Sequence, residues 1–111
     1  MCTLSFSRKD SILRVKVRGE LDDHAASMVR RAIDAQIRTE GVRRVILDLN
    51  ELTFMDSAGI GVILGRYKEL VKRGAVLEID AANDSIRRIL RLAGIHRLVR
   101  IRGGAEGKKE A

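Results

Sequence analysis

Two segments that read as buried strands, each followed by a segment of helical periodicity, constrain the fold of this chain most. Residues 45–49 form a nearly continuous apolar run, and residues 75–79 form a second such strand segment. Runs of this kind are typical of strands that are covered on both faces. Because parallel strands need long crossover connections, the alternation predicts a layered α/β domain with a mainly parallel sheet and helices packed on it.

The start of the chain has a different pattern. Residues 12–18 alternate apolar and basic side chains, which predicts a strand with one solvated face, and residues 3–8 are expected to pair with it as a hairpin. Each helical stripe begins near a capping side chain and ends at a glycine. The expected helices run from Asp22 or Asp23 to Gly41, from Ser57 to Arg73 before Gly74, and from Asn83 to Gly94, with a last short strand at Leu98 to Ile101.

Size and composition fit one folded domain. The chain has 111 residues, of which 45% are hydrophobic, and its aromatic residues are two Phe and one Tyr, so the core must be aliphatic. The sequence shows no signal peptide and no membrane-spanning segment, and Cys2 has no partner for a disulfide. We therefore expect a cytoplasmic protein without a membrane partner, with a domain at residues 1–102 and a disordered tail at residues 103–111.

The charge is uneven along the chain. The formal net charge is +7, and residues 83–102 carry six arginines against one acid, Asp84. A basic third helix fits an acidic partner, a solvated helix face or a nucleic acid. Arg87, Arg88 and Arg91 share a face that could contact phosphates, but no aromatic side chain lies nearby to stack on bases. Nucleic-acid binding is therefore the less favoured alternative.

The loop between the strand at 45–49 and the second helix is the best candidate for function, because binding sites in α/β sheets collect at the carboxyl ends of strands. Ser57 lies at the start of that helix, where free N–H groups and the helix dipole would stabilise a phosphate on its hydroxyl. The alternative is that Asp56 or Ser57 is only the N-cap. No phosphate-binding loop is present, and His24 and His96 lack a Cys or His partner at ligand spacing, so we expect no metal site.

Residues 54–69, Phe-Met-Asp-Ser-Ala-Gly-Ile-Gly-Val-Ile-Leu-Gly-Arg-Tyr-Lys-Glu, resemble the signature of STAS domains. Residues 19–22, Gly-Glu-Leu-Asp, match a second motif of that family, and the resemblance covers about residues 3–101. Within the family the chain looks most like the anti-sigma factor antagonists of endospore-forming bacteria. The resemblance implies a single STAS domain and a regulatory protein that is not an enzyme.

The resemblance also implies a mechanism and partners. Such antagonists bind an anti-sigma factor that is also a serine kinase, and so release the sigma factor, here sporulation sigma F. The kinase uses its own ATP, so that the antagonist needs no cofactor, to phosphorylate the residue matching Ser57, which ends binding until a serine phosphatase restores it. The alternative is an antagonist in a stress-response sigma pathway. The residues implied in partner binding are Asp22, Asp56, Ser57, Ala58, Gly59 and Gly61.

Overall fold

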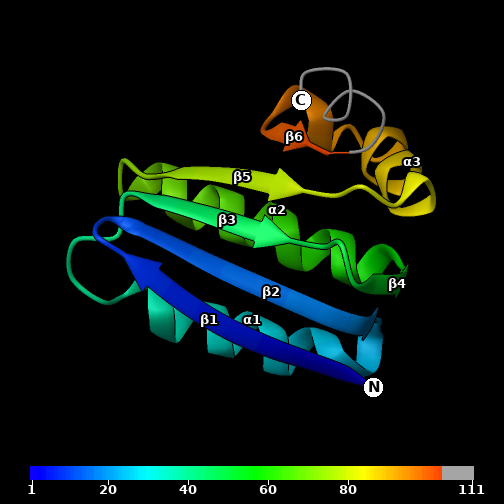
Figure 1. Ribbon diagram of the computed structural model, residues 1–111, viewed down its shortest axis with the longest axis horizontal. Coiled ribbons are helices and arrows are strands. Elements are labelled where there is room, and N and C mark those ends of the chain that lie inside the picture. The colour runs from blue at the N-terminus through cyan, green and yellow to red at the C-terminus, as the bar shows by residue number, and fades with distance from the viewer. Residues whose placement is uncertain (104–111) are drawn as a thin grey trace.

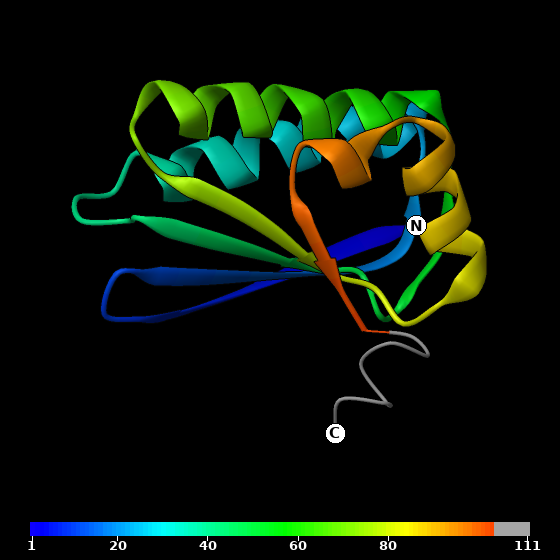
Figure 2. The same ribbon diagram turned by 90° about the horizontal axis from the view of Figure 1, so that it is seen from above.

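A mixed sheet with two long helices on one face forms the body of the domain (Figures 1 and 2). The computed structural model describes residues 1–103, so the predicted tail lies outside the described residues except for Gly103. The strands are β1 (Cys2–Lys9), β2 (Ile12–Leu21), β3 (Arg44–Asp48), β4 (Leu52–Met55), β5 (Val76–Asp80) and β6 (Arg100–Arg102). The helices are α1 (Asp23–Ile37), α2 (Ser57–Lys72), α3 (Asp84–Leu92) and the 3₁₀ helix η1 (Ile95–Arg97).

The sheet order is β1-β2-β3-β5-β6, with β4 pairing with β2 beyond the end of β3. The pairing of β1 with β2 is antiparallel, and all other pairings are parallel. This confirms the predicted α/β domain with an N-terminal hairpin and a mainly parallel sheet. Helix α3 lies at the end of the sheet toward which the parallel strands point (Figure 1).

The core is aliphatic and lies between the sheet and the two long helices. In β2 the apolar residues Leu13, Val15 and Val17 are at most 1% exposed, whereas the basic residues between them are half-buried or exposed on the other face. Helix α1 contributes the stripe Val29, Ile33 and Ile37. Full burial of such a side chain contributes about 1.5–3 kcal/mol, so the alternation predicted for residues 12–18 fixes which face of the strand meets the helices.

Three details differ from the sequence expectation. The last strand, expected at Leu98 to Ile101, is β6 at Arg100–Arg102, because the N–H groups of Leu98 and Val99 donate to the carbonyl of Ile95 and extend the turn of η1. Strand β4 was not expected, because its four residues have no alternating pattern, and their two ends are buried while the middle is exposed. Helix α1 ends at Ile37 rather than at Gly41. The hydroxyl of Thr39 donates to the carbonyl of Gln36 at 2.6 Å and closes the helix early, while Gly41, at φ +85°, serves the turn that follows.

Charged side chains form a network on the sheet face opposite the helices. Arg14, near the start of β2, lies 2.6 Å from Asp80 and 3.3 Å from Asp48, the last residues of β5 and β3. The backbone and side-chain amides of Asn50 also donate to Asp48, at 3.1 and 2.9 Å. Burial alone would raise the pKa of Asp48, but the hydrogen bonds from Asn50 and the charge of Arg14 outweigh it and lower the pKa below its ordinary value of 3.8.

This network predicts a specific loss of stability in acid. A carboxyl group whose pKa is lowered by folding stabilises the protein above its unfolded pKa, and that contribution is lost as the pH falls through the folded pKa. We expect Asp48→Asn to lower the free energy of unfolding by about 1–2 kcal/mol at neutral pH. Denaturant titrations from neutral pH to below pH 3.8 should show the two proteins converging as the pH falls. A difference that stays constant with pH would contradict this role of Asp48.

Candidate functional site

Strand β4 brings two segments together that lie far apart in the sequence. Leu21, at the end of β2, is the register partner of Met55, at the end of β4. The backbone N–H of Asp56 also donates to the carbonyl of Leu21 at 3.4 Å. Because Asp22 and Asp56 follow the paired residues directly, both lie at the same carboxyl edge of the sheet, where binding sites of α/β domains collect.

Both aspartates cap helices. The backbone N–H groups of Ala58 and Gly59 donate to Oδ1 of Asp56 at 2.9 and 3.3 Å, which makes Asp56 the N-cap of α2. The backbone N–H of Ala25 donates to Oδ1 of Asp22 at 3.0 Å, which makes Asp22 the N-cap of α1. Asp56 therefore performs the capping for which either Asp56 or Ser57 was a candidate, and the hydroxyl of Ser57 is left for another role.

Ser57 is the first residue of α2, and its side chain is exposed. Its hydroxyl takes part in no hydrogen bond with any residue between 1 and 103. The N-terminal turn of a helix carries unpaired N–H groups and the positive end of the dipole. The hydroxyl is thus accessible to another molecule, and a phosphate on it would lie where the backbone favours negative charge.

The two glycines of the first turns of α2 have different surroundings. A methyl group added at Gly59 would lie 2.6 Å from the carbonyl oxygen of Leu21 and 2.6 Å from Cγ of Met55. A methyl group added at Gly61 would meet no atom within 4 Å, and this residue is exposed. Gly59 is buried, so its lack of a side chain serves packing of α2 against β2. Gly61 is exposed with open space around it, so the partner contact expected of these glycines stays a prediction that fits Gly61 better than Gly59.

A shallow groove of about 330 Å³ lies beside Ser57, between α1 and α2. On α2 it is lined by Ala58, Gly61 and Val62. On α1 it is lined by Asp23, Ala26, Ser27 and Arg30. Nothing in the sequence pattern indicated a functional role for the last three of these residues. Their spacing shows that they share a helix face, but only the packing of α1 against α2 places that face next to Ala58 and Gly61. Small side chains on α2 leave this groove open.

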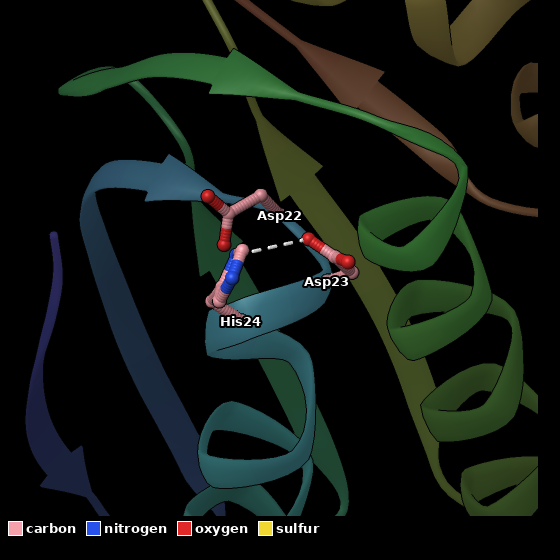
Figure 3. Close-up of side chains that lie close together, drawn as sticks. All are labelled: Asp22, Asp23 and His24. Atoms are coloured by element: carbon pink, nitrogen blue, oxygen red, sulfur yellow. Dashed lines mark ion pairs between the residues drawn. The ribbon is translucent and has the colours of Figure 1, made fainter.

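Three possible ligand atoms lie together at the start of α1, on Asp22, Asp23 and His24 (Figure 3). Nδ1 of His24 is 3.1 Å from Oδ1 of Asp23, and both side chains are exposed. Asp22, however, already accepts a backbone hydrogen bond with its carboxylate, and the positive end of the α1 dipole lies here. These features disfavour a cation, so we assign no metal to the cluster and regard it as part of the surface around the groove.

The arginines of α3 do not form the uniform exposed face that the sequence suggested. Nη1 of Arg87 donates to the carbonyls of Ala81 and Arg102 at 3.0 and 3.3 Å, so this half-buried side chain is held against the domain. Arg88 and Arg91 are exposed. The surface for the nucleic-acid alternative is therefore smaller than three arginines on one face would provide.

The capping geometry predicts how substitutions at Asp56 affect stability. Ala at an N-cap leaves two helix N–H groups without their acceptor, so Asp56→Ala should lower the free energy of unfolding by about 1–2 kcal/mol. Asn caps a helix about as well as Asp, so Asp56→Asn should cost much less. Denaturant melts of the two variants measure the difference. Equal losses for Ala and Asn would mean that the charge of Asp56, and not its capping bond, supplies the stability.

Comparison with known proteins identifies the family of the chain. The profile of the STAS domain matches residues 4–105, nearly the whole chain. The chain is 38% identical over 90 residues to the anti-sigma F factor antagonist of Paenibacillus polymyxa, which covers 81% of this chain and 77% of that protein. It is 30% identical over 98 residues to the anti-sigma-B factor antagonist of Staphylococcus aureus, covering 88% of this chain and 90% of the relative.

Solved structures show the same fold. The unphosphorylated form of the anti-sigma factor antagonist SpoIIAA superposes with a TM-score of 0.72 at 23% identity, covering 96% of this chain and 94% of that one. An anti-sigma factor antagonist from Mycobacterium paratuberculosis superposes with a TM-score of 0.84 at 23% identity, covering 96% and 89%. Among the helices of residues 1–103, none has the length and apolar character needed to span a membrane.

Proposed function

The chain belongs to the STAS domain family, and from this premise we propose that it is an anti-sigma factor antagonist that is switched by phosphorylation of Ser57. In its unphosphorylated form it binds an anti-sigma factor with serine kinase activity and displaces the sigma factor held there. The kinase then phosphorylates Ser57 and is released, and a serine phosphatase regenerates the binding form. These partners place the protein in the cytoplasm, where sigma factors act.

One observation carries the proposal: the exposed hydroxyl of Ser57 at the start of α2, beside an aspartate that already caps the helix. Relatives at 38% and 30% identity are named as antagonists of anti-sigma factors and not as enzymes. The chain contributes an acceptor group, and the partner contributes ATP and catalysis. Transfer forms a bond between Ser57 Oγ and phosphorus, breaks the bond to ADP, and releases the hydroxyl proton. The antagonist therefore needs no cofactor of its own.

The position of Ser57 explains how phosphate can end binding without unfolding the domain. A phosphoserine adds about −1.5 to −2 charges, and the N-terminus of α2 favours them. The fold should therefore persist. The added bulk and charge instead lie at the edge of the groove that Ala58 and Gly61 leave open, where a docked partner would have to accommodate them. The switch thus acts at the interface.

Two sigma pathways are candidates for the partner. Antagonists of anti-sigma F are 38% and 33% identical to this chain, whereas those of anti-sigma B are 30% identical. The higher identity favours sigma F and sporulation, and a stress-response pathway is the second candidate. An adjoining gene for a small serine-kinase anti-sigma factor, followed by a sigma-factor gene, would identify the pathway.

The proposal is tested by incubating the protein with that kinase and Mg-ATP and measuring the intact mass. We expect the wild type to gain one phosphoryl group and Ser57→Ala to gain none while still binding the kinase. Ser85→Ala, which changes another exposed serine near a helix start but outside the groove, is the matched control and should be phosphorylated normally. Binding without any mass gain in the wild type would leave a constitutive binding module and exclude the switch.

A further inference from the structure

A basic pocket of about 210 Å³ lies away from the Ser57 groove, between α3, η1 and β6. Figures 1 and 2 show the chain passing from α3 through the η1 segment to β6 at this edge of the sheet. Three arginines and one histidine dominate its walls, and no carboxylate is among the described residues that line it. The lining residues are Arg87, Arg91, His96, Val99, Arg100 and Ile101.

One of the arginines is held in position by the protein itself. Arg87 is half-buried, and its Nη1 donates to the carbonyl of Ala81 at 3.0 Å and to that of Arg102 at 3.3 Å. These bonds tie the side chain to the ends of β5 and β6, so its guanidinium is oriented before any ligand arrives. A charged group that is ordered in advance loses less conformational entropy on binding.

The other two arginines carry charge that no neighbour neutralises. Arg91 and Arg100 are exposed, and neither forms an ion pair within the described part of the chain. The register partner of Arg100 is Glu78, whose carboxylate lies 4.0 Å from Arg44 instead. The acidic residue of α3 is Asp84, which lies in the first turn of the helix, whereas Arg91 lies in the last turn. Asp84 is therefore about two helical turns away from Arg91 and forms no ion pair with it.

Basic side chains elsewhere on the sheet show a different arrangement. Lys16 and Arg18 both lie within 3.4 Å of Glu51, and Arg14 contacts Asp48 and Asp80. Positive charge is therefore matched on the central strands, whereas Arg91 and Arg100 at the pocket form no ion pair with a described residue. This contrast points to an anionic ligand, because guanidinium groups gathered around one pocket repel one another, and a bound anion would offset that repulsion.

We propose that this pocket binds the phosphoryl group of a small anion. Planar guanidinium groups donate paired hydrogen bonds that match the oxygens of a phosphate. The pocket is smaller than the roughly 300 Å³ at which sites for drug-sized ligands begin, so it suits phosphate or pyrophosphate and not a whole nucleoside. This binding is independent of the phosphorylation switch at Ser57 and can fail or succeed separately from it.

The test titrates the full chain with inorganic phosphate and with pyrophosphate, keeping ionic strength constant with sodium chloride, and follows backbone amides by NMR. We expect saturable shifts confined to the end of α3, η1 and β6. Arg91→Gln with Arg100→Gln should weaken binding by about tenfold or more, because two charge-assisted contacts are lost. Phosphoserine is titrated alongside to distinguish a free anion from a phosphorylated protein as the source of the phosphoryl group. Tighter binding of phosphoserine than of phosphate and pyrophosphate would overturn the assignment to a small anion and assign the phosphoryl group to a protein.

The matched control is Arg88→Gln with Arg97→Gln, which removes the same charge from α3 and η1 at exposed side chains outside the pocket. It should change the affinity by no more than about twofold. Thermal melts check that both double variants fold. Unsaturated shifts with both anions would overturn the proposal. So would equal losses in the two double variants, since a nucleic-acid backbone bound along the whole basic surface would depend on both pairs alike.

Discussion

Ser57→Asp is expected to lower the affinity for the anti-sigma factor by about a hundredfold or more, while leaving the thermal melt of the domain unchanged. The substituted carboxylate lies at the positive end of the α2 dipole, so it should not destabilise the helix. We expect binding to weaken because a charged group replaces a small hydroxyl at the edge of the proposed docking groove, and a buried unpaired charge at an interface costs several kcal/mol.

Titration calorimetry against the anti-sigma factor measures this loss, with Ser57→Ala as a variant that keeps binding. Ser85→Asp makes the same chemical change near the N-terminus of α3, where Ser85 is exposed. It should leave both binding and stability unaffected. Full-strength binding by Ser57→Asp would exclude a role of charge at this position. Loss of the cooperative melting transition in Ser57→Asp would instead mean that the switch acts through unfolding.

Gly61→Ala is expected to weaken binding to the anti-sigma factor without destabilising the fold, whereas Gly59→Ala is expected to destabilise the fold. Since a methyl group at Gly61 meets no atom of the domain, the variant should be as stable as the wild type or more stable by about 0.5–1 kcal/mol. The same methyl group stands in the docking groove, so affinity for the anti-sigma factor should fall by about tenfold or more.

Gly65→Ala is the matched control, because a methyl group there also meets no atom within 4 Å, one turn further along α2. It should gain the same helix stability without a comparable loss of affinity. Gly59→Ala should instead lower the free energy of unfolding by about 1–3 kcal/mol, since the carbonyl of Leu21 must move. Unchanged affinity in Gly61→Ala would place the docking surface elsewhere than in the groove.

Much of the candidate site could be proposed from the sequence, because its chemistry is local. The position of Ser57 next to a helix start follows from the polar segment before an apolar stripe, and the motif at residues 54–69 points to the STAS family. The identity of the capping residue did not follow. Asp56 and Ser57 are both good N-caps, and only the backbone conformation, with Asp56 extended and Ser57 helical, distinguishes them.

The groove and the basic pocket could not be predicted from the sequence, since each is built from elements separated along the chain. Arg30 and Gly61 line one groove because α1 and α2 pack side by side, and Arg91 and Arg100 line one pocket because η1 returns the chain to β6. Strand β4 is a further case. Its four residues have no periodic signal, and it forms because β2 extends past β3 and offers it unpaired hydrogen-bonding groups.

The sequence by itself determined the order of the main strands and helices, the aliphatic core, the family, and the serine exposed at the start of α2. These depend on periodicity, capping and motif spacing, which act over a few neighbouring residues. Only the tertiary structure decided that Gly59 is buried and serves packing, whereas Gly61 is exposed. It also decided which arginines form ion pairs and which line a pocket. Those properties depend on atoms from distant segments, because burial and charge compensation are set by what surrounds a residue in space.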